Sequence, residues 1–219
     1  MKNIPEFTET IEEWTHFFIP LSDGVKLAAR AWLPINAIEQ PVPAILEYIP
    51  YRKRDGTAIR DEQMHPYWAA FGYACVRVDI RGSGESDGLL HDEYLQQELD
   101  DAVEVINWLE HQDWCSGKVG MMGKSWGGFN CLQVAALRPS ALKALITVCS
   151  TDDRYADDCH YRGGAVLIEN FSWASTISGF MAKPPDPLLL PETWRENWLE
   201  RLQNMPFFAK NWLEHTYKD

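Results

Sequence analysis

Two serines of the sequence stand in the G-x-S-x-G pattern, at residues 84–88 (GESDG) and 123–127 (GKSWG). In serine hydrolases this pattern places the serine hydroxyl on a sharp turn between a strand and a helix, where it attacks an acyl carbonyl. The flanking glycines let the neighbouring backbone approach without a Cβ clash. Ser125 lies directly between a strand pattern and a helix pattern, whereas Ser86 lies in a charged loop several residues before the next helix. This context favours Ser125 as the nucleophile.

The residues after Ser125 predict a means of stabilising negative charge. The predicted helix begins at Trp126, and its first free backbone N–H groups point toward the serine hydroxyl. Together with the positive end of the helix dipole, they could bind the oxyanion of a tetrahedral intermediate. A simpler alternative is a glycine-rich turn that only packs the helix against the strand.

Two competing glycine motifs fit less well. Residues 123–125 (GKS) match the end of a phosphate-binding loop, but the first glycine of that motif would fall on Lys118. The glycines at 82, 84 and 88 resemble a dinucleotide-binding turn, but their spacing is one residue too long and nearby acidic residues would repel a pyrophosphate. The five cysteines contain no C-x-x-C pair and predict neither a disulfide framework nor a zinc site. We therefore expect no cofactor and no metal.

Alternating strands and helices must position these residues. Apolar runs bounded by Gly, Pro and charged residues predict strands, and apolar residues spaced by three and four predict helices. The predicted strands are 15–20, 25–34, 44–49, 73–80, 118–122 and 142–149, and the predicted helices are 62–71, 92–114 and 126–137. The first two strands form a hairpin around Asp23-Gly24. The remaining alternation predicts an α/β fold, with a mostly parallel sheet sandwiched between helices.

After residue 150 the pattern changes. Residues 151–219 contain four tryptophans, a proline cluster and no clear apolar strand, which predicts helices and loops that lie over the sheet. We therefore divide the chain into an α/β core at 1–150 and a helical segment at 151–219.

Five stretches of the sequence together indicate a protein family more specifically than any single motif does. They are 23–27 (DGVKL), 50–54 (PYRKR), 79–86 (DIRGSGES), 123–128 (GKSWGG) and 152–164 (DDRYADDCHYRGG). In this order they resemble the cocaine esterase and X-Pro dipeptidyl-peptidase group of α/β-hydrolases, whose members are esterases, amidases or dipeptidases. The resemblance implies an α/β-hydrolase fold, a small-molecule or short-peptide acyl substrate, and a helical cap that begins within 151–219.

The resemblance also implies residue roles. Ser125 would be the nucleophile, and Tyr51 would lend its side-chain hydroxyl to an oxyanion hole beside the backbone N–H of Trp126. A packing aromatic at a strand end is the alternative for Tyr51. Asp79 and Arg81 match the family's motif at the end of a strand, and we expect them to form an ion pair that holds the loop.

A catalytic triad in this fold also needs an acid and a histidine that follow the serine in the chain. Candidate acids after Ser125 are Asp152, Asp153, Asp157, Asp158, Asp186 and Glu192, and candidate bases are His160 and His215. His215 is the distant base, but it lies in a helical pattern with no strand before it. We therefore expect an incomplete α/β-hydrolase, with the acid and the histidine encoded beyond Asp219 and very low activity from this chain alone.

The alternative function is that of a non-catalytic α/β binding or assembly module, in which the turn around Ser125 is kept only as part of the architecture.

The charge of the chain disfavours nucleic acid and anionic membranes as partners, because 32 acidic and 20 basic residues give a net charge of −12. The chain has no signal-peptide pattern and no apolar run approaching roughly 20 residues, so we expect a cytoplasmic protein without a membrane span. If the chain ends at Asp219, we expect the strand 142–149 to form an exposed apolar edge, through which a homo-oligomer could form.

Overall fold

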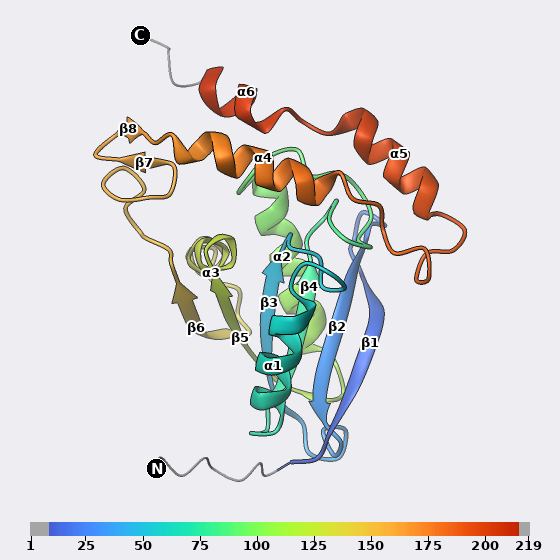
Figure 1. Cartoon of the computed structure of the whole chain (residues 1–219). Coiled ribbons are helices and arrows are strands. Elements are labelled where there is room, and N and C mark those ends of the chain that lie inside the picture. The colour runs from blue at the N-terminus through green and yellow to red at the C-terminus, as the bar shows by residue number, and fades with distance from the viewer. Residues whose placement is uncertain (1–8, 215–219) are drawn as a thin grey trace, which may run out of the picture.

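The computed structural model of the chain describes residues 9–214 and contains a six-stranded sheet (Figure 1). Its strands are β1 (Ile11–Pro20), β2 (Lys26–Pro34), β3 (Val42–Ile49), β4 (Ala74–Asp79), β5 (Cys115–Lys124) and β6 (Leu142–Val148). The strand order is β1-β2-β4-β3-β5-β6. β2 pairs antiparallel with β1 and β4, and all other neighbours pair parallel. The predicted hairpin and the mostly parallel sheet are confirmed.

Helices cover both faces of this sheet (Figure 1). α1 (Ala58–Ala69) contacts β2 and β4, and its Ala69 packs in a cluster with Trp32 and Cys75. On the other face, α2 (Gln96–Glu110) and α3 (Trp126–Ala136) contact β3 and β5 and bury Val105 and Val134 in the main core. The predicted sandwich of helices around the sheet is therefore present.

Helix α2 is shorter at both ends than predicted. Ala102, Val105 and Leu109 recur at helical spacing and are fully buried. The helix does not start before Gln96 because Tyr94 has a φ of 57°, which a right-handed helix does not allow. After Glu110 a short turn leads into β5.

The segment after residue 150 contains a small hairpin and three helices. The hairpin joins β7 (Tyr161–Arg162) to β8 (Ala165–Val166), and the helices are α4 (Glu169–Met181), α5 (Trp194–Asn204) and α6 (Phe208–Glu214). The helices agree with the sequence pattern, whereas the hairpin was not predicted. In Figure 1 these helices lie across the carboxyl ends of the parallel strands.

Two buried arginines bond the C-terminal helices to the loops of the core. Arg52, in the loop after β3, donates to the carbonyl oxygen of Pro184 at 2.8 Å. Arg201 of α5 is 5% exposed and donates to the carbonyl oxygens of Gly84, at 2.7 Å, and of Ser86. The loops that follow β3 and β4 are therefore fixed to the segment that lies over them.

Strand β6 forms one edge of the sheet, as predicted. Ile146 and Val148 are 49% and 48% exposed on it, so this edge is apolar and accessible in the described part of the chain. Such an edge can pair with another strand. A homo-oligomer formed through it remains a prediction.

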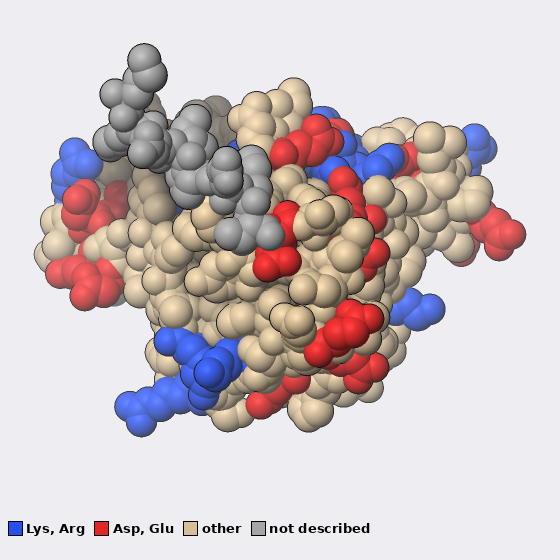
Figure 2. All heavy atoms as spheres, turned by 90° about the horizontal axis from the view of Figure 1, so that it is seen from below, with Lys and Arg blue, Asp and Glu red and all other residues tan. Residues whose placement is uncertain are grey.

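The surface charge is mixed on the face drawn in Figure 2. There, both basic and acidic side chains lie at several places around the face, so it is not uniformly basic. The exclusion of nucleic acid as a partner remains a prediction. None of the described helices is long and apolar enough to cross a membrane.

Candidate active site

Ser125 lies on a sharp turn between β5 and α3. β5 ends at Lys124 and α3 begins at Trp126. Ser125 has a φ of 57° and a ψ of −116°, a backbone conformation that costs a non-glycine residue about 1–3 kcal/mol. Its N–H donates to the carbonyl of Val148 at 2.8 Å, and its carbonyl accepts the N–H of Phe129 at 3.0 Å. The strand, turn and helix predicted around this serine are therefore present.

Three glycines around the turn leave no room for side chains. A Cβ on Gly123 would lie 2.4 Å from the backbone of Gly127, and a Cβ on Gly127 would lie 2.8 Å from Ile49. A Cβ on Gly128 would lie 2.7 Å from Ser150 Oγ. These distances are shorter than van der Waals contact. The glycines therefore let the first turn of α3 pack against the ends of β3, β5 and β6.

The hydroxyl of Tyr51 reaches this turn from the loop after β3. Burial raises the pKa of Tyr51 well above its usual value. The Ser125 side chain and the backbone N–H of Trp126 lie close enough to the hydroxyl to oppose this change in part. Tyr51 is therefore a neutral hydroxyl that can donate a hydrogen bond. The structure brings Ser125, Tyr51 and Trp126 together, and their catalytic roles remain a prediction.

Aromatic rings also surround Tyr51. Its ring centroid lies 6.1 Å from Trp173 and 5.7 Å from Phe180, both on α4, and 6.5 Å from Trp126. The packing interpretation of Tyr51 therefore also holds, because the ring contacts three aromatic rings while the hydroxyl contacts Ser125. On the side of α4, Tyr51 is therefore lined by the rings of Trp173 and Phe180.

The serine of the second G-x-S-x-G motif holds its own loop together. Ser86 is fully buried, and its Oγ donates to the carbonyl of Asp79 at 2.6 Å and accepts the N–H of Ala28 at 2.8 Å. A Cβ on Gly84 of the same motif would lie 2.1 Å from the Asp79 carboxylate. Because its hydroxyl is occupied as donor and acceptor and is closed to solvent, Ser86 is not placed to attack a substrate.

Asp79 and Arg81 do not form the predicted ion pair. The Asp79 carboxylate pairs with Arg77 at 3.1 Å and accepts the backbone N–H of Lys53 at 3.0 Å. Arg81 pairs with Asp101 of α2 at 2.7 Å. Arg77 and Asp79 lie two residues apart in β4 and point to the same face, whereas Arg81 lies beyond the strand. Asp79 therefore holds the loop after β3, and Arg81 holds the loop after β4 to α2.

Glu98 contacts Trp126 in a way that the sequence did not indicate. Its carboxylate, 5% exposed in the first turn of α2, accepts the indole N–H of Trp126 at 2.6 Å. In the sequence this acid only fits the common enrichment of acidic residues near helix N-termini. Because 28 residues separate Glu98 from Trp126, no local spacing reveals the contact.

Comparison with known proteins identifies the family of the chain. The model of the X-Pro dipeptidyl-peptidase (S15) family matches residues 23–219. The chain belongs to this family. The S15 chain is 32% identical over 169 residues to the cocaine esterase of Rhodococcus sp. (strain MB1 Bresler). The aligned region covers 74% of the chain and 28% of that esterase. It is also 30% identical over 119 residues to a putative Xaa-Pro dipeptidyl-peptidase of Streptomyces avermitilis. That aligned region covers 48% of the chain and 17% of the peptidase.

The fold of the S15 chain also matches solved structures. A CocE/NonD family hydrolase from Staphylococcus aureus superimposes with a TM-score of 0.73 over 95% of the chain and 37% of that protein, at 23% identity. The family resemblance and the α/β-hydrolase fold predicted from the sequence are confirmed. The S15 chain spans less than a third of the length of the cocaine esterase that it matches.

His160 of the S15 chain is not available as the base of a triad. Its Nε2 lies 2.6 Å from the Glu93 carboxylate, and its Nδ1 contacts the side-chain oxygen of Asn170. Burial lowers the pKa of His160, but hydrogen bonds to Cys159 and Glu93 outweigh it and raise the pKa to about 11. A protonated imidazole cannot accept the serine proton. The other candidate base, His215, lies outside the described residues.

None of the six candidate acids pairs with a histidine within residues 9–214. Three of them pair with arginines, as Asp157–Arg162 at 3.4 Å, Asp158–Arg154 at 3.2 Å and Asp186–Arg54 at 3.4 Å. Asp153 accepts two backbone N–H groups of the loop that follows it, and Asp152 and Glu192 are exposed. These contacts do not test whether one of the six acids belongs to a triad. That none of them does stays a proposal.

The protonated His160 predicts a stability contribution that is lost at alkaline pH. Its folded pKa of about 11 lies above the usual 6.5, so the contribution is fully present below about pH 6.5 and falls as the pH rises toward 11. We expect the difference in Tm between the intact protein and its His160→Gln variant to shrink from about pH 6 to about pH 10. His111→Gln is a control for the loss of an exposed imidazole, since the ring of His111 contacts the Asn107 carbonyl of its own helix region. A His160→Gln difference in Tm that stays constant between these pH values would contradict the prediction.

One group of side chains has the composition of a metal site. Glu47, Asp61 and His65 are buried and offer ligand atoms within 4.8 Å of one another. Arg60, however, lies 2.5 Å from Glu47 and 2.6 Å from Asp61, and Arg77 lies 3.4 Å from Asp61. Both carboxylates are therefore already neutralised by arginines, which fits a structural ion-pair network between α1 and the sheet better than a cation site.

Proposed function

We propose that the S15 chain supplies the nucleophile and the oxyanion hole of a serine hydrolase that cleaves an acyl ester or amide through a Ser125 acyl-enzyme. The observation that carries this proposal is the convergence of the Ser125 side chain and the Trp126 backbone N–H at the Tyr51 hydroxyl. The family match and the similarity to a cocaine esterase and a putative Xaa-Pro dipeptidyl-peptidase support the same class of reaction.

In the proposed reaction, Ser125 Oγ attacks the acyl carbonyl carbon and the carbonyl π electrons move to the oxygen. The resulting oxyanion accepts hydrogen bonds from the Tyr51 hydroxyl and the Trp126 N–H. A general base takes the serine proton and gives it to the leaving alcohol or amine, so that the acyl group stays on Ser125. Water then attacks the acyl-enzyme and releases the acid.

We further propose that the base and its acid come from residues that are not part of this sequence. Both ring nitrogens of His160 contact other side chains, those of Glu93 and Asn170, which supports a different residue as the general base for Ser125. The short span of the S15 chain relative to cocaine esterase, 28% of its length, supports the same proposal. On this proposal, the isolated chain keeps Ser125 protonated and has very low activity.

The helices after residue 150 are proposed to begin a cap over the substrate pocket. Trp173 and Phe180 of α4 lie against Tyr51, and Trp173 also lies 6.4 Å from the ring of Trp126. Ligand pockets are lined mainly by such apolar and aromatic groups. The aromatic wall suits the acyl part of a small or short-peptide substrate.

Hydrolysis assays of the intact protein test the proposed class. We expect turnover of a nitrophenyl butyrate ester or of an Ala-Pro nitroanilide, and the preferred substrate tells whether the acyl donor is an ester or a peptide. A fluorophosphonate, which reacts with activated serines, should label the protein. The absence of turnover and of labelling would overturn the proposal and favour a non-catalytic module that keeps the turn as architecture.

The variant Tyr51→Phe tests the oxyanion hole. It keeps the aromatic ring and removes the hydroxyl, and loss of one oxyanion donor should lower kcat by about 10²-fold with little change in KM. Tyr155→Phe is the control, because Tyr155 is 71% exposed. An unchanged kcat in Tyr51→Phe would leave packing as the role of this side chain.

A further inference from the structure

A buried carboxyl group holds the residue that provides the backbone donor of the oxyanion hole. Glu98 Oε1 accepts the indole N–H of Trp126 at 2.6 Å, and Oε2 accepts the backbone N–H of Tyr94 at 2.9 Å. Trp126 is fully buried, so its indole N–H would lose its partner and meet no solvent if Glu98 were removed. An unsatisfied buried donor is costly, which makes this contact a strong constraint on the position of Trp126.

A second contact ties the same helix to the strand that leads to Tyr51. Asn130 lies one turn after Trp126 in α3, is fully buried, and lies close enough to Glu98 to favour its charged form. Its side-chain nitrogen donates to the carbonyl of Tyr48 at 3.0 Å. Tyr48 lies in β3, three residues before Tyr51. The contacts of Glu98 and Asn130 therefore connect the two elements that present the oxyanion donors.

We infer that Glu98 is a positioning residue of the oxyanion hole, which acts by fixing Trp126 relative to the loop that carries Tyr51. The inference rests on the proposed function of Ser125, Tyr51 and Trp126. It explains how the neighbouring Ser125 keeps a backbone conformation that few non-glycine residues adopt, since such conformations persist only where the surrounding structure fixes them. Displacement of a catalytic group by about 1 Å can cost about 10²-fold in rate.

The protonation of Glu98 makes its contact with Trp126 dependent on pH. Burial raises the pKa of Glu98 to about 7, although the hydrogen bonds from Trp126 and Tyr94 oppose this change. Above about pH 7 both carboxylate oxygens accept hydrogen bonds, whereas a protonated carboxyl turns one oxygen into a donor. The contact is therefore strongest above about pH 7 and weakens as the pH falls.

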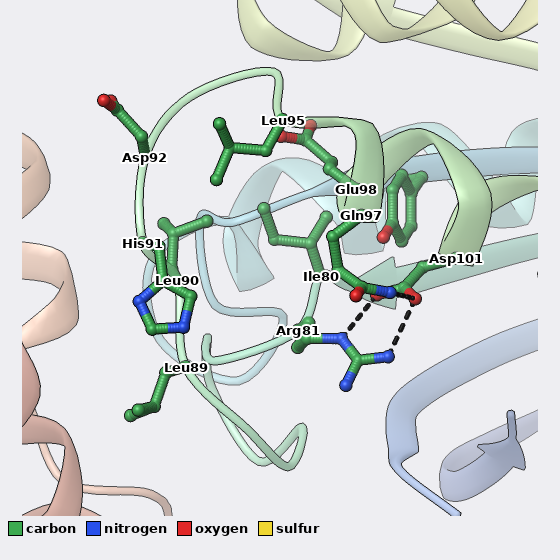
Figure 3. A pocket seen from close by; sticks show the side chains of 11 residues that line it. Ile80, Arg81, Leu89, Leu90, His91, Asp92, Leu95, Gln97, Glu98 and Asp101 are labelled. Carbon is green, nitrogen blue, oxygen red and sulfur yellow. Dashed lines mark hydrogen bonds and ion pairs between the residues drawn. The ribbon is translucent and has the colours of Figure 1, made fainter. Parts of the chain in front are cut away.

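The charge of Glu98 is not paired with a Lys or Arg among residues 9–214. Figure 3 shows the small pocket beside it, about 30 Å³ in volume, with Glu98 and Asp101 on α2 and the loop 89–95 closing the pocket. Arg81 faces this pocket but pairs with Asp101, and no Lys or Arg pairs with Glu98 in the part of the chain that is described. The titratable groups around Glu98 are Tyr48, Arg81, His91, Asp92, Glu93, Tyr94 and Asp101. Hydrogen bonds alone therefore stabilise the charged form of Glu98.

The variant Glu98→Gln in the intact protein tests the inference by kinetics. Glutamine keeps an acceptor for the indole N–H but cannot also accept the N–H of Tyr94, and it is neutral at every pH. We expect kcat for the ester to fall about tenfold with KM changed less than about twofold, and the pH profile to lose an inflection near 7. Trp126→Phe, which removes the same indole donor, should give a similar loss, and the two losses should not add. Glu104→Gln is the control, because Glu104 lies on the same helix and contacts Ser22 instead.

The indole N–H resonance of Trp126 gives a readout that does not need turnover. In nitrogen-15 spectra this signal is identified by its loss in Trp126→Phe. It should shift with pH around a midpoint near 7 in the wild type and stay fixed in Glu98→Gln. If Ser125→Ala abolishes turnover while Glu98→Gln changes neither kcat nor this resonance, the inference is wrong and the proposed function stands. If Ser125→Ala leaves turnover intact, both the inference about Glu98 and the proposed function are wrong.

Discussion

Replacing Ser125 with alanine should lower ester hydrolysis by the intact protein by at least about 10⁴-fold and abolish its labelling by a fluorophosphonate. The expectation follows from the position of Ser125 between β5 and α3, where its side chain contacts the Tyr51 hydroxyl. Removal of the hydroxyl removes the atom that forms the acyl-enzyme, and the remaining oxyanion donors cannot replace it. Turnover and labelling are measured on the same preparation.

The serine of the other motif provides a matched control for this experiment. Ser86→Ala removes a buried hydroxyl that makes two hydrogen bonds, so it should lower the free energy of unfolding by about 1–3 kcal/mol. The folded fraction of this variant should still be labelled, because Ser125 is unchanged. Labelling of Ser125→Ala at the wild-type level, or its loss in folded Ser86→Ala, would show that the nucleophile is a different residue.

Replacing Lys53 with methionine should destabilise the protein by about 3–5 kcal/mol. Lys53 Nζ lies 2.7 Å from the Glu85 carboxylate, and both side chains are no more than 1% exposed. Burial and the nearby Lys53 ammonium lower the pKa of His16 to about 4, so the imidazole is neutral and its Nδ1 contacts Lys53 Nζ at 3.2 Å. Methionine fills the space but leaves Glu85 as a buried charge without a cation. Urea unfolding of the intact protein measures the loss.

A double variant separates the unpaired charge from lost packing. In Lys53→Met/Glu85→Leu no buried charge of this pair remains, so much of the lost stability should return. Lys183→Met breaks the exposed pair with Asp55, 3.5 Å apart, and should cost less than about 1 kcal/mol. If Lys53→Met lowered the free energy of unfolding no more than Lys183→Met does, the buried pair would not stabilise the protein as its geometry indicates.

The central strands of the sheet could be predicted from the sequence because they are buried on both faces. β3 and β4 lie in the centre of the sheet, are buried almost throughout, and are therefore nearly continuous apolar runs. The insertion of β4 between β2 and β3 has no local signal, because strand order results from contacts between distant segments. The β7–β8 hairpin was missed because two-residue strands show no alternation, although Gly163-Gly164 is a hairpin turn signal.

The candidate site could be predicted only where its residues are close in sequence. Ser125 and Trp126 are consecutive, so one motif indicates both. Tyr51 came from the family resemblance, because nothing local to it indicates a contact with a serine far along the chain. Glu98 was missed because its contact with Trp126 spans 28 residues. The contact between His160 and Glu93, which removes a candidate base, spans 67 residues and was missed for the same reason.

The glycines at 123, 127 and 128 are required by the crowding of three strand ends against α3, and this requirement does not depend on any reaction. A relative that has lost catalysis would still need them, because the same segments would still meet at the same point. Their presence in a sequence is therefore evidence of shared architecture and says nothing about whether the protein turns over a substrate. Inactive members of such a family are better recognised at positions 51 and 125, where a hydroxyl can disappear without disturbing the turn.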